Sequence, residues 1–195
     1  MIIAMTGKKG SGKSTVGDYI ANQYGFKQYA FAAPMKLTAH HTFGWTDRHL
    51  YGDLKEQVDP LWGISPRQFL QWYGTDAMQH GLSAAFPDFA MTTGRYLWVR
   101  RFALSVYDPA IDWVITDLRF PHEYEGLCLT DAKVIVVRVD RPGCEGDAHE
   151  SERQIDEVHP DYIIDNDADI GWLWWQVEQV MDDVGADAVP DAREA

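Results

Sequence analysis

The segment GKKGSGKST follows the apolar run MIIAM, and its last two residues open a helix expected over Ser14–Tyr24. Gly7, Gly12, Lys13 and Ser14 match the pattern G-x-x-x-x-G-K-[ST] in the strand–loop–helix context that this pattern requires. Glycines let backbone N–H groups surround phosphates, Lys13 reaches the β- and γ-phosphates, and the Ser14 hydroxyl can ligate Mg²⁺. The residues expected to hold this triphosphate are Gly7, Lys9, Gly10, Ser11, Gly12, Lys13, Ser14 and Thr15. The alternative is a glycine-rich turn with an incidental lysine.

Apolar, β-branched-rich segments alternate with helix-like segments along the chain. The expected strands span residues 1–5, 28–32, 113–117, 133–139 and 161–165. The expected helices span residues 14–24, 34–42, 66–76, 98–107, 121–130, 150–157 and 170–184. Runs such as VIVV suit strands that are buried on both faces, so the alternation predicts an α/β fold with a parallel sheet. Residues 77–97 have weak periodicity and two glycines, and we expect an irregular excursion there.

The composition limits the partners of the chain. Its 195 residues carry a net charge of −13, which opposes binding to the phosphate backbone of a long nucleic acid. No apolar run approaches the roughly 18 residues of a membrane span, and the start lacks the layout of a signal peptide. The two cysteines, Cys128 and Cys144, are too far apart for a CxxC motif, and unpaired thiols indicate a reducing cytoplasm. We therefore expect a cytoplasmic protein that binds small molecules, neither nucleic acid nor membrane.

A second polar group follows the apolar strand expected at residues 113–117. Asp117 lies at its carboxyl end, where ligands bind in open parallel sheets, and is suited to a contact with the Mg²⁺ held by Ser14. Arg119 lies two residues later, and its planar guanidinium fits a phosphate. The alternatives are a helix N-cap for Asp117 and a surface ion pair, such as one with Glu123, for Arg119.

The helix expected at Pro66–Asp76 has mixed polarity. Arg67, Gln71 and Thr75 are spaced by four and share one face, so they offer a guanidinium, an amide and a hydroxyl to a phosphate and a base edge. An ordinary amphipathic helix with a solvated polar face is an equally good interpretation. Further candidate cations are Lys36 and one member of the adjacent pair Arg100 and Arg101.

The segment Val137–Asp156 carries Arg138, Arg141, His149 and Arg153 around two glycines and a proline. A glycine-rich loop with arginines beyond a strand end suits a lid that excludes water and stabilises transition-state charge. The alternative is a plain solvated connection. The seven histidines show no spacing typical of a zinc site.

Taken together, the motifs resemble the deoxynucleoside monophosphate kinases of bacteriophages. The matching segments, in chain order, are GKKGSGKST, AFAAPMK, PRQFLQWYGTD, YLWVRRFA, VITDLRFPHE, VVRVDRPG with DAHESE, and DYIIDNDADI. The combination of QxxGTD, DxRFxxE and RPG followed by HxSE is much narrower than the phosphate loop alone. The resemblance implies a three-layer P-loop NTPase fold with a five-stranded parallel sheet, flanking helices and a lid insertion.

The same resemblance implies that ATP with Mg²⁺ donates a phosphoryl group to a deoxynucleoside monophosphate, for nucleotide supply to DNA synthesis. Catalytic roles fall to Lys13, Asp117, Arg119 and Arg141, metal contacts to Ser14 and Asp117, and a place against the donor adenine to Asn166. The residues that would flank the acceptor are Lys36, Arg67, Gln71, Thr75, Asp76, Arg101 and Arg119. The chain departs from many relatives after GTD, where Gln79 and His80 replace an expected arginine.

We therefore expect one kinase domain over residues 1–184, an acceptor region near 34–107, a lid near 140–156, and an acidic flexible tail at 185–195. The alternatives are a kinase of another small phosphorylated metabolite, such as a phosphomevalonate or dephospho-coenzyme A, and a nucleotide-dependent switch or ATPase. The oligomeric state stays open, with a homodimer as one option.

Overall fold

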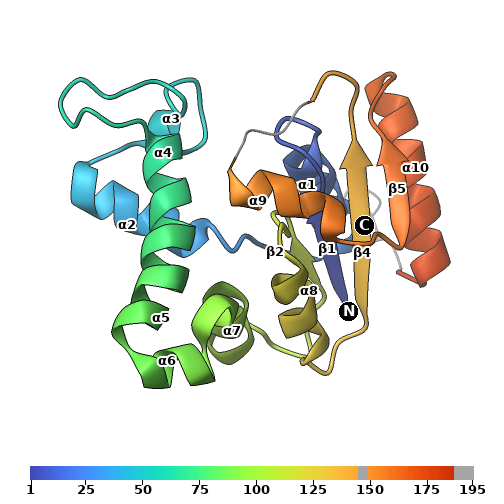
Figure 1. Cartoon of the computed structure of the whole chain (residues 1–195). Coiled ribbons are helices and arrows are strands. Elements are labelled where there is room, and N and C mark those ends of the chain that lie inside the picture. Colours follow the sequence, from blue (N-terminus) through green and yellow to red (C-terminus); the bar gives the residue numbers. More distant parts are fainter. Residues whose placement is uncertain (145–148, 187–195) are drawn as a thin grey trace. The chain divides into compact units, whose positions relative to one another are not determined.

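The structure is a computed structural model that describes residues 1–144 and 149–186. It divides into two compact units (Figure 1). The sheet unit comprises Met1–Ala30 and the chain from Ser105 onward, and the helical unit comprises Phe31–Leu104. Each unit is described by itself.

The sheet unit is built on five parallel strands in the order β2-β3-β1-β4-β5. Their bounds are β1 (Ile2–Thr6), β2 (Lys27–Tyr29), β3 (Trp113–Ile115), β4 (Val134–Asp140) and β5 (Tyr162–Asp165). The register pairs Ile3 of β1 with Val114 on one side and with Ile135 on the other. The predicted five-stranded parallel sheet is confirmed, since all five expected strands form.

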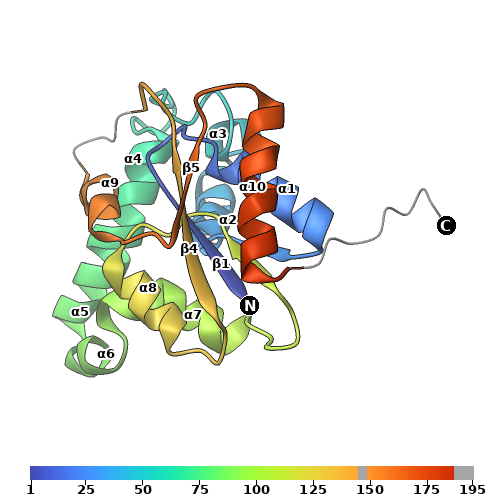
Figure 2. The same cartoon turned by 90° about the vertical axis from the view of Figure 1, so that its right-hand side faces the viewer.

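Helices cover both faces of this sheet and make the predicted three layers (Figure 2). One face carries α1 (Lys13–Tyr24) and α10 (Ile170–Val184). The other carries α8 (Pro121–Cys128) and α9 (Glu150–Arg153), which continues as the short 3-10 helix η3 (Gln154–Glu157). Pro121 begins α8 without penalty because the first helical residue needs no N–H partner.

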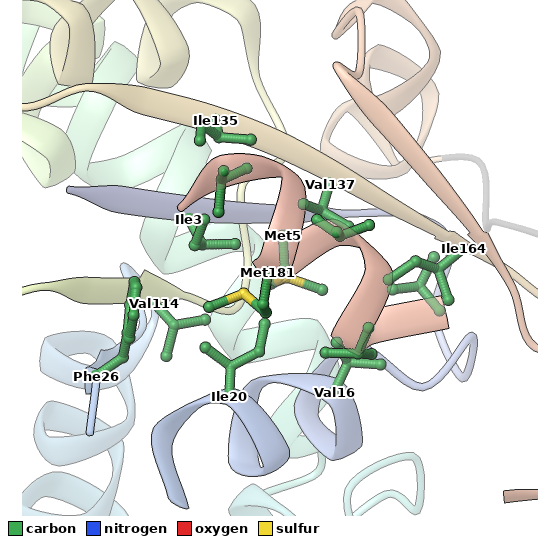
Figure 3. Close-up of a cluster of buried hydrophobic side chains, with 14 of the residues drawn as sticks. Ile3, Met5, Val16, Ile20, Phe26, Val114, Ile135, Val137, Ile164 and Met181 are labelled. Carbon is green, nitrogen blue, oxygen red and sulfur yellow. The ribbon is translucent and has the colours of Figure 1, made fainter. Parts of the chain in front are cut away.

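The core of the sheet unit lies between the sheet and the helices α1 and α10. Figure 3 shows Ile3 and Met5 of β1 pointing toward Val16 and Ile20 of α1 and Met181 of α10. Every residue of β1 is buried, as expected for a central strand covered on both faces. This packing fixes the end of β1, from which the phosphate loop emerges.

The helical unit contains eight segments: α2 (Ala33–Phe43), α3 (Asp47–Leu50), α4 (Pro66–Gln71), the π-helix η1 (Trp72–Gly81), α5 (Leu82–Ala85), α6 (Pro87–Thr92), the 3-10 helix η2 (Gly94–Tyr96) and α7 (Leu97–Ser105). Its small core packs Ala39, Trp45, Leu50 and Phe69 together. Phe43 stacks on Trp45 with ring centroids 4.4 Å apart.

Two expectations for this unit are wrong. Residues 77–97 are mostly helical and not irregular, with short helices that begin at Leu82, Pro87 and Gly94. The sequence did not reveal them because each helix is too short to show a periodic pattern. The helix expected to end at Asp76 runs on to Gly81, and from Trp72 it follows a π-helical path. Wider π turns are rare and have no propensity signal in a sequence.

Candidate functional site

The phosphate loop joins β1 to α1 through glycines that no other residue could replace without strain. Gly7 and Gly12 have φ angles of 130° and 109°. A Cβ atom at Gly7 would lie 2.3 Å from the carbonyl oxygen of Val139, and one at Gly12 would lie 2.5 Å from Nδ2 of Asn166. Gly12 caps α1 without a side-chain hydrogen bond, so the first N–H groups of the helix face the loop.

Lys13 lies across the loop that it follows. Its Nζ donates to the carbonyl oxygens of Gly7 and Lys8 at 2.6 and 2.7 Å. The ammonium group is thus held within the ring of backbone atoms that is expected to surround the phosphates.

Asn166 directly follows β5 and binds the phosphate loop by a hydrogen bond. Its Nδ2 donates to the carbonyl oxygen of Ser11 at 2.8 Å, and its backbone N–H donates to Asp140 at 2.7 Å. Asn166 therefore has a structural contact with the loop that the sequence did not predict, in addition to any contact with a ligand.

A cavity of about 490 Å³ opens over the start of α1. Most of the residues expected to bind the donor line it, and so do the apolar residues Ile170 and Leu173 of α10. Its lining consists of Gly10, Gly12, Lys13, Ser14, Thr15, Arg141, Asn166, Ala168, Ile170 and Leu173. This volume is in the range of small-molecule pockets. Of the other expected donor residues, Gly7 and Ser11 are buried within the loop and Lys9 is exposed.

A network of charged side chains links the phosphate loop to Asp156, the last residue of the expected lid. Asp156 of η3 accepts from Lys8 Nζ at 2.6 Å and from the Arg138 guanidinium at 2.5 Å. The hydrogen bond from Lys8 is the main cause that lowers the pKa of the Asp156 carboxyl below its usual value. Arg138 belongs to strand β4 and also lies 3.5 Å from Asp140. Residues 145–148 of the expected lid lie outside the described residues.

Asp117 and Arg119 lie in the turn between β3 and α8. Since β3 pairs in parallel with β1, this turn emerges at the same edge of the sheet as the phosphate loop. The N–H of Leu118, between the two charged residues, donates to Met5 of β1 at 3.0 Å. Asp117 and Arg119 are both half-buried. The alternative role of Asp117 as the helix cap is excluded, because Phe120 holds that position.

Glu123 is a buried acid beneath this turn. Its side chain, 4% exposed, accepts the backbone N–H groups of Arg119 at 2.8 Å and Phe120 at 3.2 Å. Burial raises the pKa of Glu123 to about 8, with a further contribution from the charge of Asp117. The expected alternative for Arg119 was a surface ion pair with Glu123, but Glu123 is buried and not on the surface. The charge of Arg119 acts on the Glu123 carboxyl group and opposes the rise of its pKa.

The residues expected at the acceptor side lie in the helical unit, apart from Arg119. Arg67 and Thr75 are buried, at 7% and 4% exposure, so they do not lie on a solvated polar face. Gln71 is half-buried, and Asp76 and Arg101 are exposed.

Lys36, also of the helical unit, lies with its Nζ 3.7 Å from the centre of the Tyr51 ring, a cation–π geometry.

The π-helical path places Gly74 in a tight position. A Cβ atom there would lie 2.5 Å from Sδ of Met35, and the Gly74 carbonyl accepts the indole N–H of Trp98 at 2.9 Å. Gln79, in the stretch where an arginine was expected, is 1% exposed. Thr75 and Gln79 both lie in the π-helix and are both buried, which the four-residue spacing did not reveal.

Two further features bear on the chemistry. In the part of the chain that the structure describes, no group of three or more His, Cys, Asp or Glu side chains could hold a metal ion, and no helix is long and apolar enough to cross a membrane. Cys128 and Cys144 are free thiols.

Comparisons with known proteins place the chain in one family. The profile described as deoxynucleotide monophosphate kinase matches residues 1–59 and 49–177. A protein of Acanthamoeba polyphaga mimivirus, provisionally named a deoxynucleotide monophosphate kinase, is 30% identical over 190 residues, covering 93% of this chain and 96% of that protein. An unliganded sugar kinase from Janibacter sp. HTCC2649 shares the fold, with a TM-score of 0.50, 14% identity, and coverage of 93% of this chain and 92% of that one. The chain therefore belongs to the deoxynucleotide monophosphate kinase family of ATP-dependent phosphotransferases.

Proposed function

We propose that this chain transfers the γ-phosphoryl group of ATP to the phosphate of a deoxynucleoside 5′-monophosphate, producing ADP and a deoxynucleoside diphosphate for DNA synthesis. The observation that carries the proposal is the cavity over the start of α1, in which the phosphate loop meets Arg141 and Asn166, in a chain of this family.

The lining of the cavity supports a division of roles on the donor side. Lys13 and the N–H groups at the start of α1 bind the triphosphate, as in other phosphate loops. Ile170 and Leu173 supply apolar surface for the adenine ring, with Asn166 at its edge. Arg141, which lines the same cavity, spreads the charge that develops on the transferred group.

The residues present fit an Mg²⁺ ion that is bound mainly through the substrate. The hydroxyl of Ser14 and the carboxylate of Asp117 are hard oxygen ligands, and both follow strands that pair in the sheet. Mg²⁺ usually takes one or two protein oxygens and completes its shell with water and phosphates. When bound, the ion would neutralise charge on the β- and γ-phosphates.

On the acceptor side, an oxygen of the monophosphate attacks the γ-phosphorus in line while the bond to the β–γ bridging oxygen breaks and ADP leaves. The acceptor phosphate is already ionised, so positioning and charge stabilisation matter more than proton transfer. We assign Arg119 to the acceptor phosphate, with further contacts from the helical unit through Lys36, Arg67, Gln71, Thr75, Asp76 and Arg101.

The remaining expectations belong to this proposal. We propose that residues 34–107 form the acceptor region and residues 140–156 the lid of one kinase domain, with a flexible tail after residue 184. We propose that the protein acts in the cytoplasm, that of the host cell if a phage encodes it, with a homodimer as one option.

An assay of ADP release across a panel of acceptors tests the proposal. The panel holds the four deoxynucleoside monophosphates, their ribose counterparts, phosphomevalonate and dephospho-coenzyme A. We expect at least one deoxynucleotide to raise turnover at least about tenfold above ATP hydrolysis alone. Stimulation by another metabolite alone would assign a different kinase, and hydrolysis that no acceptor raises would indicate a switch or ATPase.

A further inference from the structure

We infer that Glu123 is a positioning residue whose buried carboxyl group holds the turn Asp117–Phe120 in the shape that presents Arg119 to the acceptor. The role of Arg119 in this inference rests on the proposed function. The geometry of the turn does not.

The hydrogen bonds of the turn show why it needs a buried acceptor. Arg119 and Phe120 precede Pro121, the first residue of α8, so their N–H groups have no partner within the helix. A buried N–H group without a partner is costly. Oε2 of Glu123 accepts both N–H groups, at 2.8 and 3.2 Å.

The turn is held by hydrogen bonds at Leu118, just before Arg119, and at Arg119 and Phe120 themselves. On one side, the N–H of Leu118 donates to Met5 at 3.0 Å, and Leu118 is fully buried. On the other side, Glu123 holds the N–H groups of Arg119 and Phe120. These contacts fix the backbone of Arg119 and with it the direction of its Cα–Cβ bond, from which the side chain extends.

The role of Glu123 is that of a hydrogen-bond acceptor. Burial raises its pKa to about 8, and a carboxyl oxygen can accept from N–H groups in the neutral acid as well as in the carboxylate. A glutamine at this position keeps a carbonyl oxygen at the same reach, whereas an aspartate is one methylene too short and an alanine has no acceptor. These three substitutions therefore separate the acceptor function from the charge.

The first test measures hydrogen exchange of the Arg119 and Phe120 amides in the full chain. We expect Glu123→Ala to speed their exchange at least about tenfold, Glu123→Asp to have an intermediate effect, and Glu123→Gln to stay within about threefold of the parent protein. Asp161→Ala is the matched control, because its carboxylate also accepts a backbone N–H at 2.8 Å, that of Val136, in the same unit. Equal exchange at Arg119 in Glu123→Ala and Asp161→Ala would overturn the inference.

The second test compares kinetics at a temperature well below the unfolding midpoint of every variant. We expect Glu123→Ala to lower kcat with the best deoxynucleotide about 10- to 100-fold, while the dissociation constant for ATP changes less than about threefold. Glu123→Gln should keep most of the activity, and Asp161→Ala should lose stability but not kcat.

The two tests distinguish the possible failures. Faster exchange in Glu123→Ala with unchanged kcat and acceptor KM would leave Glu123 as a helix-capping residue and overturn its functional role. A loss in Glu123→Gln as large as that in Glu123→Ala, with exchange still slow, would overturn action through the turn. If the parent protein transfers phosphate to no deoxynucleotide, the proposed function fails, and the exchange experiment still decides whether Glu123 holds the turn.

Discussion

The phosphate loop of the sheet unit and the α4–η1 segment of the helical unit both carry expected site residues, but the two are built differently. In the loop, backbone groups would do most of the binding, and glycines such as Gly7 are required because a Cβ would meet the main chain at 2.3 Å. In the α4–η1 segment, binding would fall to side chains, and the polar residues Arg67 and Thr75 are themselves buried. The proposed donor site therefore depends on the local shape of the backbone. The proposed acceptor site depends on how side chains pack in the helical unit.

This difference predicts where substitutions act. Changes in the loop should abolish use of the donor, whichever acceptor is offered. Changes around the acceptor should be graded and should depend on the acceptor.

Lys13→Ala gives the largest expected effect. Removing a charge that stabilises the transferred group should lower kcat by about 10²- to 10³-fold. Steady-state rates with every acceptor measure this, and the loss should be the same for each. Lys133→Ala, whose Nζ lies 3.4 Å from the carbonyl of Val184 in the same unit, is the control and should keep full activity. A loss that varied from acceptor to acceptor would contradict the assignment of Lys13 to the donor site.

Gly7→Ala tests whether the donor end depends on backbone shape. The new Cβ would clash with the Val139 carbonyl, so we expect a loss of about 2 kcal/mol in the free energy of unfolding and weaker ATP binding. Gly185→Ala is the control, because its φ is also positive, at 78°, with no atom within 4 Å of the added Cβ. It should lose only about 1 kcal/mol. Chemical denaturation and calorimetric titration with ATP measure the two effects, and equal ATP affinity in both variants would contradict the account.

Arg119→Ala tests the other side of the comparison. We expect kcat/KM for the acceptor to fall at least about tenfold, while the dissociation constant for ATP changes little. Arg48→Ala removes an exposed arginine that pairs with Asp53 and should leave both unchanged. Unchanged acceptor kinetics together with weakened ATP binding would show that Arg119 binds the donor and not the acceptor.

The raised pKa of Glu123 predicts a pH dependence of stability. Between its ordinary value of 4.5 and about 8, the folded protein binds a proton that the unfolded chain has released, so the free energy of unfolding should fall as pH rises across this window. The steepest contribution is about 1.4 kcal/mol per pH unit. Denaturation at pH 5, 6, 7 and 8 measures the slope, and Glu123→Gln should remove this contribution. An identical slope in the variant would show that Glu123 does not titrate in this range.

Asp156→Asn gives the smallest expected effect. The carboxylate joins Lys8 to Arg138 but is 60% exposed, so solvent screening limits its contribution to the free energy of unfolding to about 1 kcal/mol or less. The effect should shrink in high salt. Asp53→Asn, at 62% exposure in its pair with Arg48, is the matched control. An effect on ATP affinity in Asp156→Asn alone would show that this network shapes the loop.

Much of the sheet unit could be predicted from the sequence because its signals are local. The run KVIVVRV predicts a buried strand, Pro121 predicts a helix start, and GKKGSGKST defines both the loop and the helix after it. The observed strands differ from the expected ranges by a few residues at their ends. Seven of the ten residues that line the donor cavity were predicted, because they lie in the phosphate loop, at the start of α1 or just after a strand end. The apolar residues Ala168, Ile170 and Leu173 were not.

The features that could not be predicted depend on contacts between distant residues. The hydrogen bond between Lys8 and Asp156 joins residues 148 positions apart, and no sequence pattern predicts it. Within the π-helix Trp72–Gly81, Gly74 packs so close to Met35 that an added Cβ would lie 2.5 Å from its Sδ, a contact between residues 39 positions apart. Glu123 was visible as the third residue of a helix that starts at a proline, a position that favours a glutamate, but its burial was not.

The fate of the γ-phosphate decides between transfer to a deoxynucleotide and simple hydrolysis. The protein is incubated with ATP labelled in the γ-phosphate and each deoxynucleoside monophosphate, and the products are separated by chromatography. We expect the label to appear in a deoxynucleoside diphosphate in a one-to-one ratio with ADP, and Lys13→Ala to slow the formation of this product about 10²- to 10³-fold. Label that appears only as inorganic phosphate, at the same rate with and without a deoxynucleotide, would contradict this expectation.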